Sequence, residues 1–143
     1  MTRPYAYLIV LSAMALALSC VHAESPPGPI KESPDASKEL GYTSVASALA
    51  GVTSKPGVTI STSKPDGWTI ATEPGGYTIW SFAPPGHYAY PAVVRRALKV
   101  REDNNLYVEM VSLCEATKDP CDRLIREFEQ LNERMREALF KGN

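Results

Sequence analysis

The sequence predicts an α+β domain in which an antiparallel sheet of about five strands is flanked by a short N-terminal helix and a long C-terminal helix. Three observations predict this order, α-β-β-β-β-β-α. Five short runs are rich in β-branched and aromatic residues, as half-buried strands are. The connections between them are short, which favours antiparallel pairing. Apolar residues recur at helical spacing before the first run and after the last one.

The N-terminal helix is predicted from one apolar face and a cap. Thr43 can cap the helix through its side-chain oxygen, and the sequence Pro56-Gly57 ends it. The apolar face consists of Val45, Ala48, Leu49 and Val52.

The strands are separated by turn sequences rich in Pro, Gly, Asp and Asn. In the fourth strand, Val94, Leu98 and Val100 are expected to face the core. Because side chains alternate along a strand, Arg95, Lys99 and Arg101 are then expected to face water. The predicted strands are Val58–Thr62, Trp68–Glu73, Tyr77–Phe82, Ala92–Arg101 and Leu106–Cys114.

The C-terminal helix is predicted to begin at Asp119 as its cap, with Pro120 at the first helical position and Gly142 after its end. Its apolar stripe is expected to cover the sheet, because a sheet needs a second layer to bury its apolar face. The stripe consists of Cys121, Leu124, Ile125, Phe128, Leu131, Met135, Ala138 and Leu139.

The first 23 residues, 1–23, have the three zones of a secretion signal. Arg3 precedes the apolar run Tyr5–Leu18, and Val21-His22-Ala23 provides compact residues for cleavage after Ala23. A membrane span needs about 20 apolar residues, and this run is shorter, so no transmembrane span is expected after cleavage. An alternative is attachment of a lipid to Cys20, because Ala17-Leu18-Ser19-Cys20 resembles an imperfect lipobox.

Three cysteines support export independently. If Cys20 leaves with the signal or carries a lipid, Cys114 and Cys121 remain as one pair. Disulfides form in oxidising compartments, so this pair is expected to be bonded in a periplasmic or secreted protein. Closing so small a ring stabilises a fold by about 2–3 kcal/mol in the chain-entropy model.

The chain is expected to contain one domain, at 40–143, after a disordered linker at 24–39. The linker holds prolines, serines and charges with little apolar surface to bury. The formal net charge of −1 gives no reason to expect a nucleic-acid partner or a generally membrane-binding surface.

The region after the third strand is the most distinctive local sequence. Residues 80–91 contain three prolines, one glycine and five ring-bearing side chains besides them. A rigid aromatic loop can present a large contact area, so His87, Tyr88 and Tyr90 are candidate binding residues. Trp80 and Phe82 fall on one face of a strand and are alternatively part of the core.

His87 is the single histidine after residue 23. A zinc site usually uses several His or Cys ligands, so we expect no metal and no cofactor. A small hydrolase could use His87 with Ser81 or Ser112, but neither serine stands in a nucleophile-elbow pattern. A second candidate surface for an acidic partner is the basic strand face of Arg95, Lys99 and Arg101, with Arg96 at its edge. Glu109 on the next strand can neutralise part of this charge.

Five segments of the sequence carry a resemblance to other proteins: Trp80–Arg96, Leu113-Cys114, Cys121-Asp122, Glu127-Phe128 and Leu131-Asn132-Glu133-Arg134-Met135. With these segments the chain resembles a group of small exported proteins of Gram-negative bacteria. The resemblance covers about two thirds of residues 24–143 and implies a periplasmic or envelope setting. It implies no activity, ligand or catalytic residue.

Together these features predict a non-enzymatic periplasmic or secreted module whose partner is another envelope or periplasmic protein, as for an inhibitor, an immunity-type protein or an assembly factor. The alternatives are a small periplasmic hydrolase or ligand-processing enzyme that uses His87, and an envelope-tethered lipoprotein.

Overall fold

The computed structural model describes residues 36–141, with side chains for 36–138. The predicted signal, including Cys20 and Ala23, lies outside the described residues, as do Gly142 and residues 24–35 of the predicted linker. No helix within the described part of the chain is long and apolar enough to cross a membrane.

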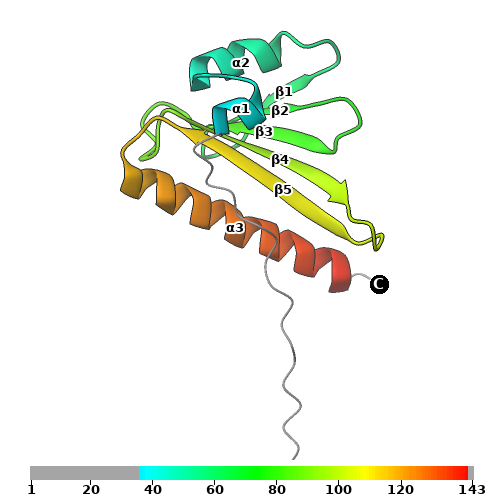
Figure 1. The fold of residues 1–143 in the computed structure, drawn as a ribbon. Helices are drawn as coiled ribbons and strands as arrows, with labels where there is room; N and C mark the ends of the chain where they lie inside the picture. The colour runs from blue at the N-terminus through cyan, green and yellow to red at the C-terminus, as the bar shows by residue number, and fades with distance from the viewer. Residues whose placement is uncertain (1–35, 142–143) are drawn as a thin grey trace, which may run out of the picture.

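The described chain forms three layers, with one antiparallel sheet between two helical layers (Figure 1). The predicted α+β class and the five strands are confirmed. The strands pair in the order of the sequence, so each connection joins neighbours. The strands are β1 (Thr59–Thr62), β2 (Thr69–Thr72), β3 (Thr78–Phe82), β4 (Ala92–Val100) and β5 (Leu106–Cys114). The helices are α1 (Ala36–Leu40), α2 (Val45–Thr53) and α3 (Lys118–Lys141).

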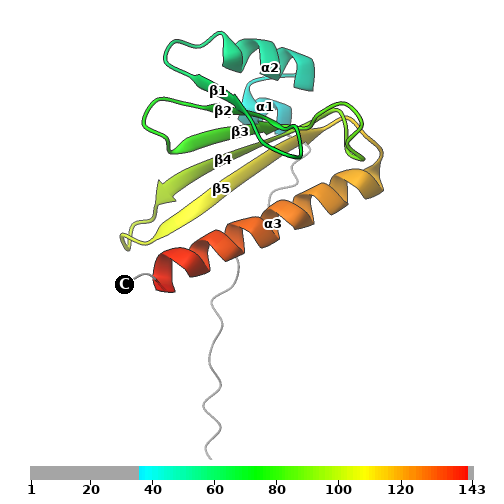
Figure 2. The same cartoon turned by 180° about the vertical axis from the view of Figure 1, so that it is seen from behind.

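Helices α1 and α2 lie on one face of the sheet, and α3 lies on the other, as the two opposite views show (Figures 1 and 2). Each face has its own core. Leu40 and Val52 pack with Trp80 on the α2 side. Val94 and Leu124 pack with Ala92 on the α3 side. Two covered faces require apolar residues at successive strand positions.

The β4 strand shows why the expected division into a core face and a water face is wrong. Val93 and Val94 are neighbours on opposite faces, and both are 0% exposed. The alternation itself is present, because Arg95 faces Trp80 and Val111 in the ladder while Arg96 faces Ile79 and Met110. Both faces are buried at the start of β4 because each has a helical layer there. At its end Val100, which was expected to face the core, is 63% exposed.

Residues 36–39, expected in the linker, instead form most of helix α1. Leu40 at its end is buried, and Ala36 packs against the same core cluster. Helix α1 lies beside β5. The apolar contacts of these two residues offset the entropy of ordering the turn, which the polar composition around them concealed.

Ser44, not Thr43, caps helix α2. The Ser44 hydroxyl accepts a hydrogen bond from the Ser47 backbone N–H at 3.1 Å, and the Ser47 hydroxyl accepts one from the Ser44 N–H at 3.1 Å. This reciprocal capping box satisfies two backbone donors. The Val45 N–H donates to Glu115 Oε1 at 2.7 Å, so the residue after β5 also holds this helix end.

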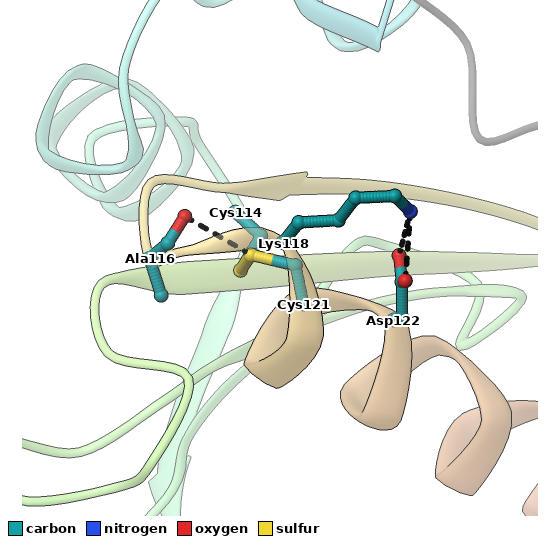
Figure 3. Close-up of polar contacts among 5 residues, drawn as sticks. All are labelled: Cys114, Ala116, Lys118, Cys121 and Asp122. Atoms are coloured by element: carbon teal, nitrogen blue, oxygen red, sulfur yellow. Dashed lines mark hydrogen bonds and ion pairs between the residues drawn. A yellow bond between two sulfur atoms is a disulfide. The ribbon is translucent and has the colours of Figure 1, made fainter.

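Helix α3 begins at Lys118, one residue before the predicted cap, and Asp119 lies in its first turn. The Cys121 N–H donates to the Thr117 carbonyl oxygen at 3.2 Å. The predicted disulfide is present between Cys114, the last residue of β5, and Cys121 (Figure 3). It joins strand to helix at the end where α3 is buried, since Leu124 is 1% exposed and Met135 is 42% exposed.

Candidate functional site

The aromatic loop after β3 is held against α3 by a hydrogen-bonded carboxylate. The Tyr88 hydroxyl donates to Glu127 Oε2 at 2.6 Å, and Arg123 Nε donates to Glu127 Oε1 at 2.9 Å. The Arg123 guanidinium also lies 4.2 Å from the centre of the Tyr88 ring. Burial and the bond to Glu127 raise the pKa of Tyr88 to about 12, so the phenol keeps its proton at neutral pH. The bond from Tyr88 lowers the pKa of Glu127.

Four rings form a cluster, of which two belong to this loop and two to the segments beside it. His87 lies 4.8 Å from Trp68 and 4.2 Å from Tyr88 between ring centres. Trp68 also meets Phe128 of α3 edge-on at 5.6 Å. Edge-on and tilted contacts of this kind stabilise aromatic pairs. The loop is therefore a fixed wall, built from residues of the turn before β2, the loop and α3.

This wall borders an open groove, which we name the loop–helix groove. Its loop end has a volume of about 500 Å³, and its helix end one of about 380 Å³. Asp66, Trp68 and Glu127 line both ends, so the two are continuous. The loop end is also lined by Pro84, Pro85, Gly86 and His87. The helix end is also lined by Ser63, Ile70, Ser81, Arg96, Phe128, Leu131 and Arg134.

Arg96 is the unusual residue of the helix end. Its guanidinium carbon lies 5.3 Å from the centre of the Phe128 ring, and Nη1 donates to the Met135 sulfur at 3.4 Å. Its Nε is buried and has no hydrogen-bond partner. Burial lowers the pKa of Arg96. Within residues 36–138, neither Arg96 nor Arg134 forms an ion pair.

The predicted basic face lies on the opposite side of the sheet from the loop–helix groove. Arg95 lies on the α2 side of the sheet, where Nη2 contacts Glu109 Oε1 at 2.8 Å and the guanidinium carbon is 5.9 Å from the Trp80 ring centre. Glu109 neutralises Arg95 in the way that the sequence predicted. Lys99 is exposed on that same side. Arg95 and Lys99 are therefore separated by the sheet from His87 and Tyr88.

His87 contacts the backbone of its own loop and two neighbouring rings rather than a nucleophile. Its Nδ1 accepts a hydrogen bond from the Ala89 N–H at 3.2 Å. Within the described residues, His87 forms no hydrogen bond with Ser81 or Ser112. Burial lowers the pKa of His87, and the nearby Glu127 carboxylate opposes that shift. The imidazole is thus favoured in its neutral form.

The two candidate tyrosines differ in exposure. Tyr88 is half-buried and anchors the loop through Glu127, whereas Tyr90 is 48% exposed. Neither tyrosine is among the residues that line the groove. The alternative for Trp80 and Phe82 is the correct one, because they are 2% and 3% exposed in the α2-side core.

Sequence reasoning did not bring together the residues that make the groove, and it placed Arg96 at the edge of the basic face instead. Trp68, Arg96 and Arg134 are far apart along the chain and line one groove because α3 covers this face of the sheet. The available signal was the pair Arg95-Arg96 in a strand with valines on both faces, since one arginine of such a pair must lie under each covering layer.

Among residues 36–138, no three His, Cys, Asp or Glu side chains gather closely enough to hold a metal ion. No protein-family profile, curated protein or solved structure matches this chain.

Proposed function

We propose that this chain is an exported, non-enzymatic binding module that holds a segment of another envelope protein in the loop–helix groove. The single observation that carries the proposal is the groove, which combines a fixed aromatic wall with two arginines that have no acidic partner in the described chain. Preformed concave sites with aromatic walls and a few polar groups are typical binding sites. A fixed wall also lowers the entropy lost on binding.

A hydrolase centred on His87 is less well supported by the contacts. A catalytic base needs a nucleophile within hydrogen-bond reach, or one bridging water. The Nδ1 atom already accepts the Ala89 N–H, and the ring is held between Trp68 and Tyr88. The loop around His87 therefore fits a binding wall better than a catalytic centre.

Site-specific photo-crosslinking in the native host tests the binding site. A photoreactive residue replaces Pro85, an exposed residue at the loop end of the groove, and in a matched variant it replaces Leu49, which is 37% exposed on α2. We expect a discrete protein adduct from position 85 and none from position 49. Adducts of equal yield from both positions, or none from position 85, would contradict the groove as the binding site.

The Tyr88→Ala and Tyr90→Ala variants sharpen this test. Tyr88→Ala removes the hydroxyl that donates to Glu127, so the wall loosens and the adduct at position 85 weakens. Tyr90→Ala leaves the wall intact, because the ring contacts that build the wall involve His87, Trp68, Tyr88 and Phe128 and not Tyr90. Equal losses from both substitutions would instead point to general damage to the loop.

Export and processing are tested by the intact mass of the protein purified from its host. Cleavage after Ala23 predicts a chain that begins at Glu24. Lipidation predicts a chain that begins at a modified Cys20 and is heavier by the attached acyl chains. The disulfide predicts a mass lower by two hydrogens until the sample is reduced. A mass that still includes residues 1–19 would contradict both routes.

A further inference from the structure

We infer that Arg96 and Arg134 make the helix end of the loop–helix groove a site for a carboxylate that a peptide partner carries beside an apolar or aromatic side chain. This inference rests on the proposed binding function and deepens it. The charge of Arg96 forms no ion pair within the described side chains.

The Arg96 guanidinium is only partly in water and is not neutralised by the described chain. Its contacts in the described chain are with the thioether sulfur of Met135 and the face of the Phe128 ring. Both are weak partners for a cation that has lost hydration, whereas a carboxylate accepts two parallel bonds from one guanidinium. Arg95, the preceding residue, has such an acid in Glu109. Of these two neighbouring arginines, the one without a carboxylate partner in the described chain is therefore Arg96, on the groove side.

The acids that also line the groove do not provide this carboxylate. Both Glu127 oxygens already accept hydrogen bonds, from Tyr88 and from Arg123. Asp66 lines the part shared by the two ends and forms no ion pair with Arg96. Because Nε of Arg96 is buried, an incoming carboxylate would meet the terminal nitrogens, which are the end of the fork. Arg134 on α3 adds a second positive charge to the same end.

The surroundings of Arg96 define what accompanies the carboxylate. Trp68, Ile70, Phe128 and Leu131 line the same end of the groove and present apolar surface. An anion with no apolar part would leave this surface wet, whereas a peptide carboxylate beside a leucine or phenylalanine side chain would cover it. The carboxylate can come from the end of a chain or from an acidic side chain, and the experiment separates these two sources.

The two tryptophans provide an internal reference for the test. Trp68 lines the groove, and Trp80 lies on the opposite face, where its Nε1 donates to Glu73 at 2.9 Å. The indole N–H signals in ¹H–¹⁵N spectra therefore report on both faces in one sample. The probes are N-acetylated tripeptides that end in leucine or phenylalanine, as free acids and as amides, and amidated tripeptides with glutamate beside leucine.

We expect the free acid or the glutamate peptide to shift the Trp68 signal and to leave that of Trp80 in place. We expect the all-amide peptides to bind more weakly by about ten- to one-hundredfold, the range for a hydrogen bond to a charged group. If the free-acid peptides bind more tightly, the carboxylate is that of a chain end, and if the glutamate peptides do, it is that of an acidic side chain. Arg96→Leu is expected to weaken binding by a similar factor, and Arg96→Lys by less, because lysine keeps the charge without the planar fork.

Lys99→Gln on the opposite side of β4 is the matched control and should leave the affinity unchanged. A melting curve for each variant shows whether it is folded. Peptide amides that bind as tightly as the acids, or an unchanged affinity in folded Arg96→Leu, would overturn the carboxylate site and leave groove binding standing. No response of Trp68 to any peptide would overturn the carboxylate site, and crosslinking at position 85 would then decide separately on the proposed function.

Discussion

Arg95 and Arg96 are neighbours in one strand, yet they lie in chemically different halves of the molecule. Arg95 enters the α2 side and pairs with Glu109, while Arg96 enters the α3 side and forms no ion pair within the described side chains. Strand alternation alone sends them to opposite faces. What differs is the layer that each face meets. A desolvated charge without a partner destabilises a fold, so the Arg96 side is the one that calls for a functional explanation.

The end of β5 also has neighbouring residues that contact different helical layers. Cys114 bonds to Cys121 and fixes α3, and the next residue, Glu115, accepts the Val45 N–H and fixes the start of α2. At this corner α3 is attached to the sheet by a covalent bond, and the start of α2 is attached by a hydrogen bond. The covalent attachment is on the side that carries the groove. The predictions below compare the two sides.

The largest effect is expected from the disulfide. Replacing Cys114→Ser together with Cys121→Ser opens a ring with a sequence separation of 7. The chain-entropy model gives a loss of about 2.5 kcal/mol in the free energy of unfolding for a ring of this size. Chemical denaturation measures it. As a control, a reductant should lower the melting temperature of the parent protein and leave that of the double variant unchanged; a reductant effect of equal size on both would contradict the prediction.

Removing the attachment of α2 should cost less. Glu115→Ala deletes the acceptor for the Val45 N–H at the helix start and should lower the free energy of unfolding by about 1 kcal/mol, as for a lost helix cap. Glu115→Gln keeps an acceptor oxygen and serves as the matched control, with a smaller loss expected. Thermal melts of the three proteins give the order. If alanine were tolerated as well as glutamine, the contact would contribute nothing to stability.

The two arginines should respond to substitution in opposite directions. Arg95→Leu removes the pair with Glu109 and the contact with Trp80, so the free energy of unfolding should fall by about 1 kcal/mol. Arg96→Leu removes a partly buried, unpaired cation, so stability should stay equal or rise. Urea midpoints of both variants measure this. A larger loss from Arg96→Leu than from Arg95→Leu would invert the comparison.

The smallest effect is a dependence of stability on pH that His87 introduces on the groove side. Burial lowers its pKa in the fold, so the folded state binds fewer protons than the unfolded state. The stabilisation is complete above the ordinary pKa of 6.5 and is lost as pH falls through the lowered value. The melting temperature should therefore drop as the pH falls from above 6.5 through this lowered pKa. His87→Gln should flatten this slope; a slope equal to that of the parent would assign it to another group.

Much of the fold could be predicted because its signals are local. The end of β5 and the start of β4 agree with the predicted residues, Cys114 and Ala92. Alternation placed Val94 and Arg95 on opposite faces, and Cys114 and Cys121 were paired by their number and compartment. Errors of one residue at Thr43 and Asp119 arose because several neighbouring side chains can cap a helix and only the backbone conformation selects one.

The candidate site was predicted only in part. His87 and Tyr88 were candidate binding residues, because a loop of prolines and rings is visible in one stretch of sequence, and His87 lines the loop end of the groove. Trp68 was not a candidate, and Arg96 was placed only at the edge of the basic face, since their position in the groove depends on which strands and helix meet. Arg95 and Lys99 were chosen as binding residues on the assumption of a solvent face, but Arg95 is paired beneath the α2 side.

The sequence by itself therefore determined the elements, their order, the antiparallel sheet and the disulfide, because periodicity, turn residues and cysteine pairing act over short distances along the chain. The tertiary structure alone decided that both faces of the sheet are covered and that the groove forms where Trp68, Arg96 and α3 meet. It also decided which of the two arginines forms an ion pair. Neutralisation of a charge depends on atoms a few ångströms away in space, and for Arg96 those atoms come from distant parts of the chain.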